Sequence, residues 1–157
     1  MKKTYSFLLI AFMITTLFAC KKDKGEQADP NDIKDTWELV ETSSSWFPVK
    51  TYLPGNGNLL QINGNTYVYY KDGQAIEQGN YSTAADTSVE ENVCLINLKD
   101  TYKTRFDITN VTPMPTIMVF KTFFYIENDK LYMISGCYAV DGGSKRVYQR
   151  SHAITID

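Results

Sequence analysis

The residue types that most often carry out chemistry are sparse in this chain, and none has the spacing of a catalytic motif. The single histidine, His152, lies five residues from the end. A histidine that activates a serine or cysteine needs an orienting partner and a surrounding pocket. Glu90 and Glu91 are neighbours in a polar stretch, whereas carboxylates that share acid and base roles face each other across a cleft. The sequence therefore predicts a protein that is not an enzyme.

Neither a metal site nor a phosphate-binding loop can be recognised in the sequence. The CxxC, HxxxH and HExxH spacings that hold zinc do not occur. Residues 141–145 (DGGSK) are glycine-rich, but they lack the GxxxxGK(S/T) spacing of a phosphate-binding loop. A hairpin turn explains these glycines better, and no cofactor is predicted.

Cys20 lies at the border between an apolar run and a charged segment. Two lysines precede 13 residues without a charge, from Phe7 to Ala19. A helix that crosses a bilayer needs about 20 apolar residues, so this run is too short to be a membrane span. A charged start, a short apolar middle and a small residue at the exit are typical of a secretion signal. Residues 1–19 are therefore predicted to be a signal peptide, with a buried N-terminal helix as the alternative.

The residues around Cys20 also carry a resemblance to a known class of proteins. Residues 17–20 (LFAC) resemble the lipobox of bacterial lipoproteins, in which a small residue precedes a cysteine that becomes the new N-terminus. The resemblance implies diacylglycerol on the sulfur of Cys20, cleavage before it, and acylation of the freed amine by a fatty acid such as palmitate. Phe18 is bulkier than the residue usual at that position. Since two acyl chains hold a protein stably, we expect lipid anchoring in the cell envelope, at the outer membrane.

The chain after the signal divides into a tether and one domain. Residues 20–31 are charged and polar with nothing to bury, which predicts a flexible lipidated tether. Residues 32–157 form a body of 126 residues, long enough for a single domain that buries about two thirds of its surface. Without the leader, 14 basic residues face 18 acids, a net charge of −4. Nucleic acid is not expected as a partner, because its binding requires a concentrated basic face.

The two remaining cysteines are Cys94 and Cys137. An exported chain meets oxidising conditions, which allow a disulfide between them. The alternative is two buried thiols in neighbouring strands, where cysteine acts as a small apolar side chain. The sequence leaves both interpretations open.

The body of the chain alternates between apolar or aromatic runs and tight-turn residues. Pairs such as Asp72-Gly73 and Asn128-Asp129 tolerate the positive φ angles of two-residue hairpin turns. The runs are rich in the β-branched and aromatic residues that favour strands. The predicted strands are TWELVETS, NLLQI, TYVYYK, QAIEQGNYS, VCLINL, YKTRFDIT, VFKTFFYIE, KLYMISGCYAV and KRVYQRSHAITI. These eight or nine segments predict an all-β fold, an antiparallel up-and-down meander.

A meander of about eight strands has two edge strands with unpaired backbone groups. It can protect them by closing into a barrel or by stacking as a two-sheet sandwich. Residues 35–40 (DTWELV) resemble the opening strand of lipocalin-like domains, although Asp35 stands where that family has glycine. Residues 145–150 (KRVYQR) resemble the closing strand. The resemblance implies a barrel in which Arg150, or alternatively Arg146, packs across Trp37. The chain is most similar to the small lipocalin-like lipoproteins of Bacteroides-type bacteria.

Aromatic residues in the predicted strands could form the wall of a ligand cavity. Tyr67 and Tyr69 share one face of their strand, as do Phe123 and Tyr125 of another, and Met133 lies in the strand that follows. Inward side chains of an eight-stranded barrel either fill it or line one small cavity, and tyrosine suits such a wall. We predict that these five residues line a ligand cavity, with plain core packing as the alternative.

Three functions follow from these patterns. The main expectation is a barrel that binds a small apolar or amphipathic ligand, with the proline-broken residues 112–118 (TPMPTIM) as a lid or a tucked crossing loop. The first alternative is a surface β-sandwich that stacks sugar rings on Trp46 and exposed tyrosines. The second is a structural subunit of an envelope complex that binds no small ligand and has a protein partner.

Overall fold

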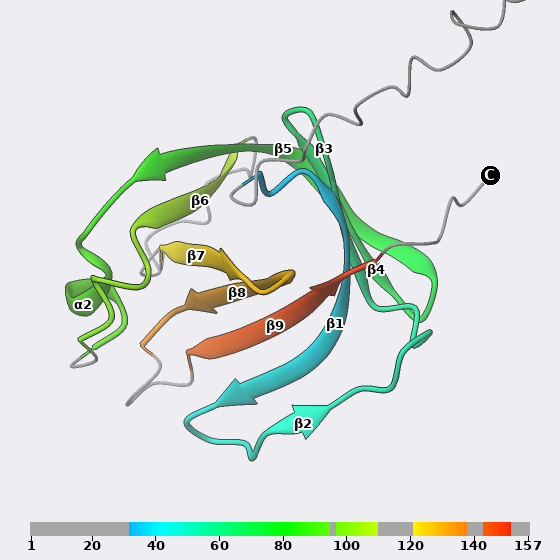
Figure 1. Ribbon diagram of the computed structural model, residues 1–157, viewed down its shortest axis with the longest axis horizontal. Helices are drawn as coiled ribbons and strands as arrows, with labels where there is room; N and C mark the ends of the chain where they lie inside the picture. The colour runs from blue at the N-terminus through cyan, green and yellow to red at the C-terminus, as the bar shows by residue number, and fades with distance from the viewer. Residues whose placement is uncertain (1–31, 95–96, 110–120, 138–142, 152–157) are drawn as a thin grey trace, which may run out of the picture.

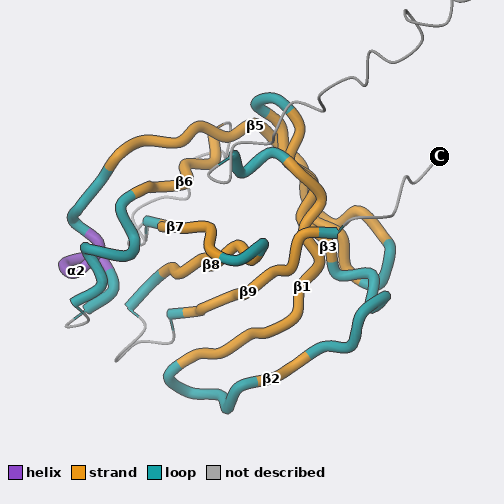
Figure 2. Tube along the Cα trace, viewed as in Figure 1, coloured by secondary structure: helices purple, strands orange, loops and turns teal. Residues whose placement is uncertain are grey.

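The computed structural model of the chain describes residues 32–94, 97–109, 121–137 and 143–151. Strands make up nearly all the regular structure in these residues, and a single helical turn accompanies them (Figure 2). The elements are β1 (Asp35–Ser44), β2 (Lys50–Thr51), β3 (Leu59–Asn63), β4 (Thr66–Lys71), β5 (Gln74–Ala85), α2 (Val89–Asn92), β6 (Thr104–Thr109), β7 (Thr122–Glu127), β8 (Lys130–Ser135) and β9 (Ser144–Arg150).

The strands form one antiparallel sheet that closes on itself (Figure 1). From β3 onward each strand pairs with the next along the chain, and β1 pairs with both β3 and β9. Eight strands therefore form a closed wall, and β2 is an additional strand on the edge of β1. The predicted up-and-down barrel is confirmed, and the closure excludes the two-sheet sandwich.

The antiparallel order gives the barrel two different ends. We call the end at which β1, β4, β6 and β8 finish the mouth end, and the opposite end the floor end. The turn between β4 and β5 lies at the mouth end, with φ angles of 51° at Asp72 and 79° at Gly73. The turn between β7 and β8 lies at the floor end, with φ angles of 51° at Asn128 and 56° at Asp129. Both are the positive-φ hairpin turns that the sequence predicts.

The interior of the barrel is an apolar cluster to which every wall strand contributes. Trp37 and Leu60 are completely buried in it. Aromatic rings pack against one another across the interior: Tyr81 stacks on Phe106 at 4.9 Å between ring centroids. The full cluster comprises Ile33, Trp37, Leu60, Ile62, Tyr67, Tyr81, Phe106, Phe124, Leu131, Met133 and Tyr148.

A second apolar cluster lies on the outer surface of β7 and β8. The turn of helix α2 places Val89 and Val93, both fully buried, against Phe123 and Ile134. The sequence predicted a strand over residues 93–98, and this prediction is wrong: Val93 follows α2, and the described part of the segment forms no strand. Its apolar residues pack on the barrel from outside instead of pairing with a neighbouring strand.

Candidate functional site

The interior of the barrel is hollow near the mouth end. A cavity of about 210 Å³ lies there, with walls from the inward faces of six strands, β4 to β9. The lining residues are Tyr69, Glu77, Phe106, Ile108, Thr122, Met133, Ser135, Ser144 and Arg146. We refer to this space as the mouth cavity.

The wall of the mouth cavity is apolar at its base and mostly polar at its rim, where Ile108 is the apolar exception. Phe106 and Met133 are buried members of the interior cluster and form the base. The rim carries Ser135 and Ser144, whose hydroxyl oxygens lie 3.2 Å apart in a hydrogen bond. Such a division suits a ligand with an apolar part and a polar end.

Arg146 is the cation of the mouth cavity. Its guanidinium carbon lies 5.9 Å from the centroid of the Tyr69 ring. The Tyr148 hydroxyl is hydrogen-bonded to Arg146, and burial raises the pKa of Tyr148, so that this phenol stays neutral. In the described part of the chain Arg146 forms no ion pair with a carboxylate, and its side chain is exposed at the open rim. Its fork of donors is therefore available to a bidentate acceptor.

The acid at the same rim is Glu77, and a tyrosine holds it in place. The Tyr67 hydroxyl donates a hydrogen bond of 2.7 Å to Glu77 Oε1. Burial, and then the bond to Glu77, raise the pKa of Tyr67, so it acts as a donor at all physiological pH values. Burial likewise raises the pKa of Tyr69. The tyrosines of the wall thus offer neutral hydroxyls.

The floor end is closed by the pair that the family resemblance implied. Trp37 and Arg150 are register partners in β1 and β9, and the guanidinium carbon of Arg150 lies 4.4 Å from the Trp37 ring centroid. The indole Nε1 donates to the carbonyl oxygen of Ile33 at 2.7 Å, and Arg150 is ion-paired with Asp35. These contacts join the first wall strand to the last.

The five residues predicted to line a ligand cavity divide between two surfaces. Tyr69 and Met133 line the mouth cavity, and Tyr67 lies in the interior beneath it with its hydroxyl on Glu77. Phe123 and Tyr125 are placed differently: both belong to the outer cluster under α2.

Phe123 and Tyr125 therefore do not line the mouth cavity, although Tyr125 borders the hollow near the floor end. Both faces of β7 are apolar, so the alternation of its residues does not distinguish inside from outside. Phe124, between the two, is the inward residue. Sequence reasoning also missed Glu77 and gave Arg146 only as an alternative for barrel closure. Alternation along β9 offered a signal, because Arg146, Tyr148 and Arg150 must share one face.

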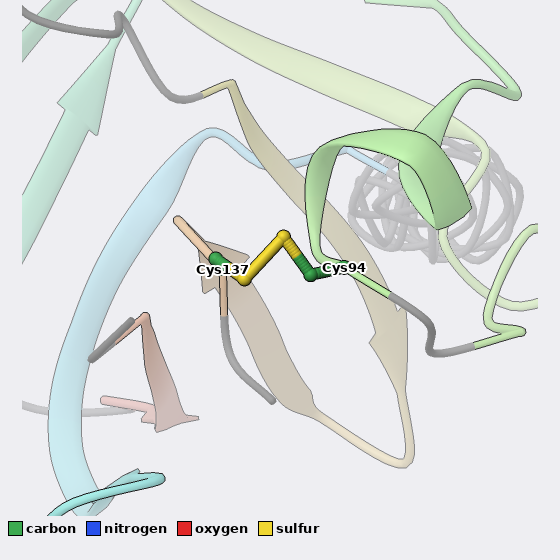
Figure 3. The surroundings of a disulfide bond; sticks show 2 residues. All are labelled: Cys94 and Cys137. Atoms are coloured by element: carbon green, nitrogen blue, oxygen red, sulfur yellow. A yellow bond between two sulfur atoms is a disulfide. The ribbon is translucent and has the colours of Figure 1, made fainter. Parts of the chain in front are cut away.

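The cysteines Cys94 and Cys137 are joined in a disulfide (Figure 3). Their Cα atoms lie 5.0 Å apart, and the bond connects residues 43 positions apart in the chain. It ties the segment after α2 to the residues that follow β8. The disulfide alternative is the one that the structure shows, and the bond holds the outer cluster closed over Phe123.

One polar cluster outside the barrel has residue types that could do chemistry. Lys121 Nζ lies 3.0 Å from Ser88 Oγ, a pairing that can activate a serine when the lysine is neutral. Here Lys121 is also ion-paired with Asp86 at 3.0 Å, and Arg105 binds the same carboxylate at 2.6 Å. Hydrogen bonds from Ser88, together with these cations, lower the pKa of Asp86. These ion pairs join the connection before α2 to β6 and to the start of β7, and we assign the cluster a structural role.

Several other predicted features can be placed or set aside. Cys20, His152 and residues 112–118 lie outside the described residues. A hollow of about 570 Å³ near the floor end is lined in part by Asp32, the first described residue, and we propose no ligand for it. Among the residues that the structure describes, no cluster could hold a metal ion, and no helix is long and apolar enough to cross a membrane.

Comparison with protein-family models, with curated proteins and with solved structures finds no match to this chain. The resemblance to lipocalin-like lipoproteins therefore stays a prediction that rests on the residues quoted above.

Proposed function

We propose that this protein is a lipid-anchored lipoprotein of the cell envelope whose lipocalin-like barrel binds a small amphipathic ligand in the mouth cavity. The apolar part of the ligand lies on Phe106 and Met133, and its polar end faces Arg146. The observation that carries the proposal is a hollow inside a closed barrel, with an arginine at its rim that forms no direct ion pair among the described residues, although Glu77 lines the same hollow.

The chemistry of the rim favours a ligand with an anionic end. A guanidinium presents a planar fork of donors that matches a carboxylate. Tyr69 and Tyr148 add neutral hydroxyls beside the cation, because burial raises the pKa of each. Glu77 lies at the same rim and disfavours a second negative charge on the ligand.

The volume of the mouth cavity limits the size of this ligand. Pockets for drug-sized molecules measure roughly 300 to 1,000 Å³, and the mouth cavity is smaller, at about 210 Å³. The proposal therefore concerns a short acyl chain or a single ring, not a haem or a long-chain lipid enclosed in the barrel.

The proposed location in the cell envelope rests on the N-terminal residues and is supported by the disulfide. Residues 1–19 have the pattern of a signal peptide, and Cys20 is the proposed site of lipidation. The Cys94–Cys137 disulfide agrees with export, since such bonds persist in oxidising compartments.

Calorimetric titration of the chain from residue 21 onward with octanoate and with 1-octanol tests the ligand proposal. This part contains every barrel strand and both apolar clusters. Octanoate is expected to bind, and Arg146→Met is expected to weaken it about tenfold or more, the effect of losing a hydrogen bond to a charged group. Binding of 1-octanol should not respond to that change.

The matched control is Lys145→Met, which removes a cation one residue away on the other face of β9. Lys145 lies 5.8 Å from the Tyr132 ring, which belongs to the outer cluster. This variant should bind octanoate like the unchanged protein. The proposal is wrong if neither compound produces heat and the methyl resonance of Met133 does not move in their presence.

A further inference from the structure

Large apolar side chains are exposed on the loop between β1 and β2. The exposed fractions are 68% for Trp46, 75% for Phe47 and 60% for Val49. Leu53 is also exposed, but it follows β2 and lies opposite the middle of β1, away from this loop. We call Trp46, Phe47 and Val49 the apolar tip. Exposed apolar side chains grouped on one loop mark an interaction site more often than scattered ones do.

Hydrogen bonds fix the turn at which the apolar tip begins. The Ser44 hydroxyl accepts hydrogen bonds from the backbone amides of Trp46, at 3.3 Å, and Phe47, at 3.1 Å. These bonds form a turn at the end of β1 and direct the loop away from the wall. Figure 1 shows the loop at the bottom of the view, beyond the end of β1 and away from the start of the described chain.

The charge around the apolar tip is basic. No aspartate or glutamate occurs from Thr42 to Lys71, although the chain contains 18 acids. Lys50 begins β2, directly after the exposed valine, and Lys145 is the register partner of Ser43 in the adjoining strand. The apolar tip is therefore flanked by two lysines, and the acid nearest to them in the described part of β1 is Glu41, opposite Thr51.

We infer that the apolar tip docks into the interfacial region of a lipid bilayer. Tryptophan and phenylalanine at the tip enter the boundary between headgroups and acyl chains, where aromatic residues are enriched in membrane proteins. Lys50 and Lys145 then lie at the level of the lipid phosphates, where each basic residue adds electrostatic attraction. A bilayer fits this surface better than a second copy of the chain, since three side chains are far fewer than the roughly 20 residues a side of a stable protein interface.

The length of chain outside the described residues allows this arrangement together with the proposed lipid anchor. The tether of residues 20–31 spans at most about 40 Å when extended. The described chain enters β1 at the floor end, and β1, with 10 residues, is about 30 Å long. A lipid on Cys20 and the apolar tip can therefore reach the same membrane surface, which would place the mouth end toward the bilayer.

The two tryptophans of the chain give a direct test, because Trp37 is completely buried and Trp46 is exposed. The chain from residue 21 onward, without its lipid, is mixed with vesicles of phosphatidylethanolamine and phosphatidylglycerol that carry brominated acyl chains. We expect a blue shift of the emission and quenching by the bromines. Trp46→Phe should abolish both responses while the protein still sediments with the vesicles.

Variants of the apolar tip and of its lysines complete the experiment. Phe47→Ser should lower the partition coefficient about tenfold, since a buried phenylalanine contributes at least this much. Lys50→Gln should weaken binding to these vesicles, and Lys130→Gln, at the floor-end start of β8, should not. The inference is overturned if vesicles neither shift nor quench Trp46. It is also overturned if the emission shifts with protein concentration alone, which indicates self-association, or only with added polysaccharide, which indicates a sugar platform. None of these readouts depends on the mouth cavity.

Discussion

The contact between Arg150 and Trp37 predicts how much the closure of the barrel contributes to the free energy of unfolding. Arg150 is only 10% exposed, and it serves three partners at once: the Trp37 ring, the Asp35 carboxylate and the more exposed Asp129 carboxylate at 3.4 Å. The substitution Arg150→Met keeps a side chain of similar length over the indole but removes the charge and the side-chain hydrogen bonds.

The expected loss can be worked out from these contacts. A cation–π contact at a partly buried ring contributes about 1 kcal/mol. The hydrogen bond between Arg150 and the Asp35 carboxylate contributes about 2 kcal/mol, as bonds to charged groups do. Asp129 is 61% exposed, so its ion pair contributes no more than about 0.5 kcal/mol. Arg150→Met should therefore lower the free energy of unfolding by about 3 kcal/mol.

Urea unfolding of the oxidised protein, followed by Trp37 fluorescence, measures this loss, with two partner variants for comparison. Asp35→Asn keeps the cation–π contact and should cost about 1 to 2 kcal/mol. Asp129→Asn should change stability by less than about 0.5 kcal/mol. The reasoning is refuted if Arg150→Met unfolds at the same urea concentration as the unchanged protein, or if Asp129→Asn is as costly as Asp35→Asn.

Three further predictions concern the groups that shape the rest of the domain. Replacing Cys94 and Cys137 by serine opens a loop of 43 residues and should cost about 4 kcal/mol, measured by urea unfolding against the oxidised protein. The pKa of Asp86 is lowered, so its contribution to stability is complete above pH of about 4, the value for an unfolded aspartate, and declines as the pH falls below it. The gap in unfolding free energy between the protein and Asp86→Asn should thus shrink from pH 6 toward pH 2. Gly57→Ala should cost clearly more than Gly55→Ala in thermal unfolding: both have positive φ, but only at Gly57 would the new Cβ lie 2.6 Å from a backbone nitrogen, whereas Gly55 has open space.

The strand order could be predicted from the sequence because its signals are local. The Asp72-Gly73 and Asn128-Asp129 turns are fixed by residues that tolerate positive φ, and these turns set which strands are neighbours. The closure had a different kind of signal, because Trp37 and Arg150 lie in the first and last strands and only the family resemblance paired them. The short hairpins then restrict the register of the strands that they join.

The two sides of the wall could not be assigned from the sequence where both are apolar. Phe123 and Phe124 are equally suited to the interior, and only the segment around Val93, packed on the outside, decides between them. The same segment was mistaken for a strand because its apolar residues look like those of a strand. Nothing in the sequence shows that they pack on the outer surface of β7 and β8. A contact between segments that lie far apart in the chain, such as the Cys94–Cys137 bond, determines this part of the fold.

The mouth cavity exists because the inward side chains become smaller from the floor end to the mouth end. In β7 the inward residues change from Phe124 to Thr122, and in β8 they change from Met133 to Ser135. The same level of β9 carries Ser144. Short polar residues in three adjoining strands at one level leave space that leucine or phenylalanine would fill, at a cost in apolar burial of about 2 kcal/mol for each side chain. The ligand that we propose would occupy this layer, and larger side chains at Thr122, Ser135 or Ser144 would close the cavity against it.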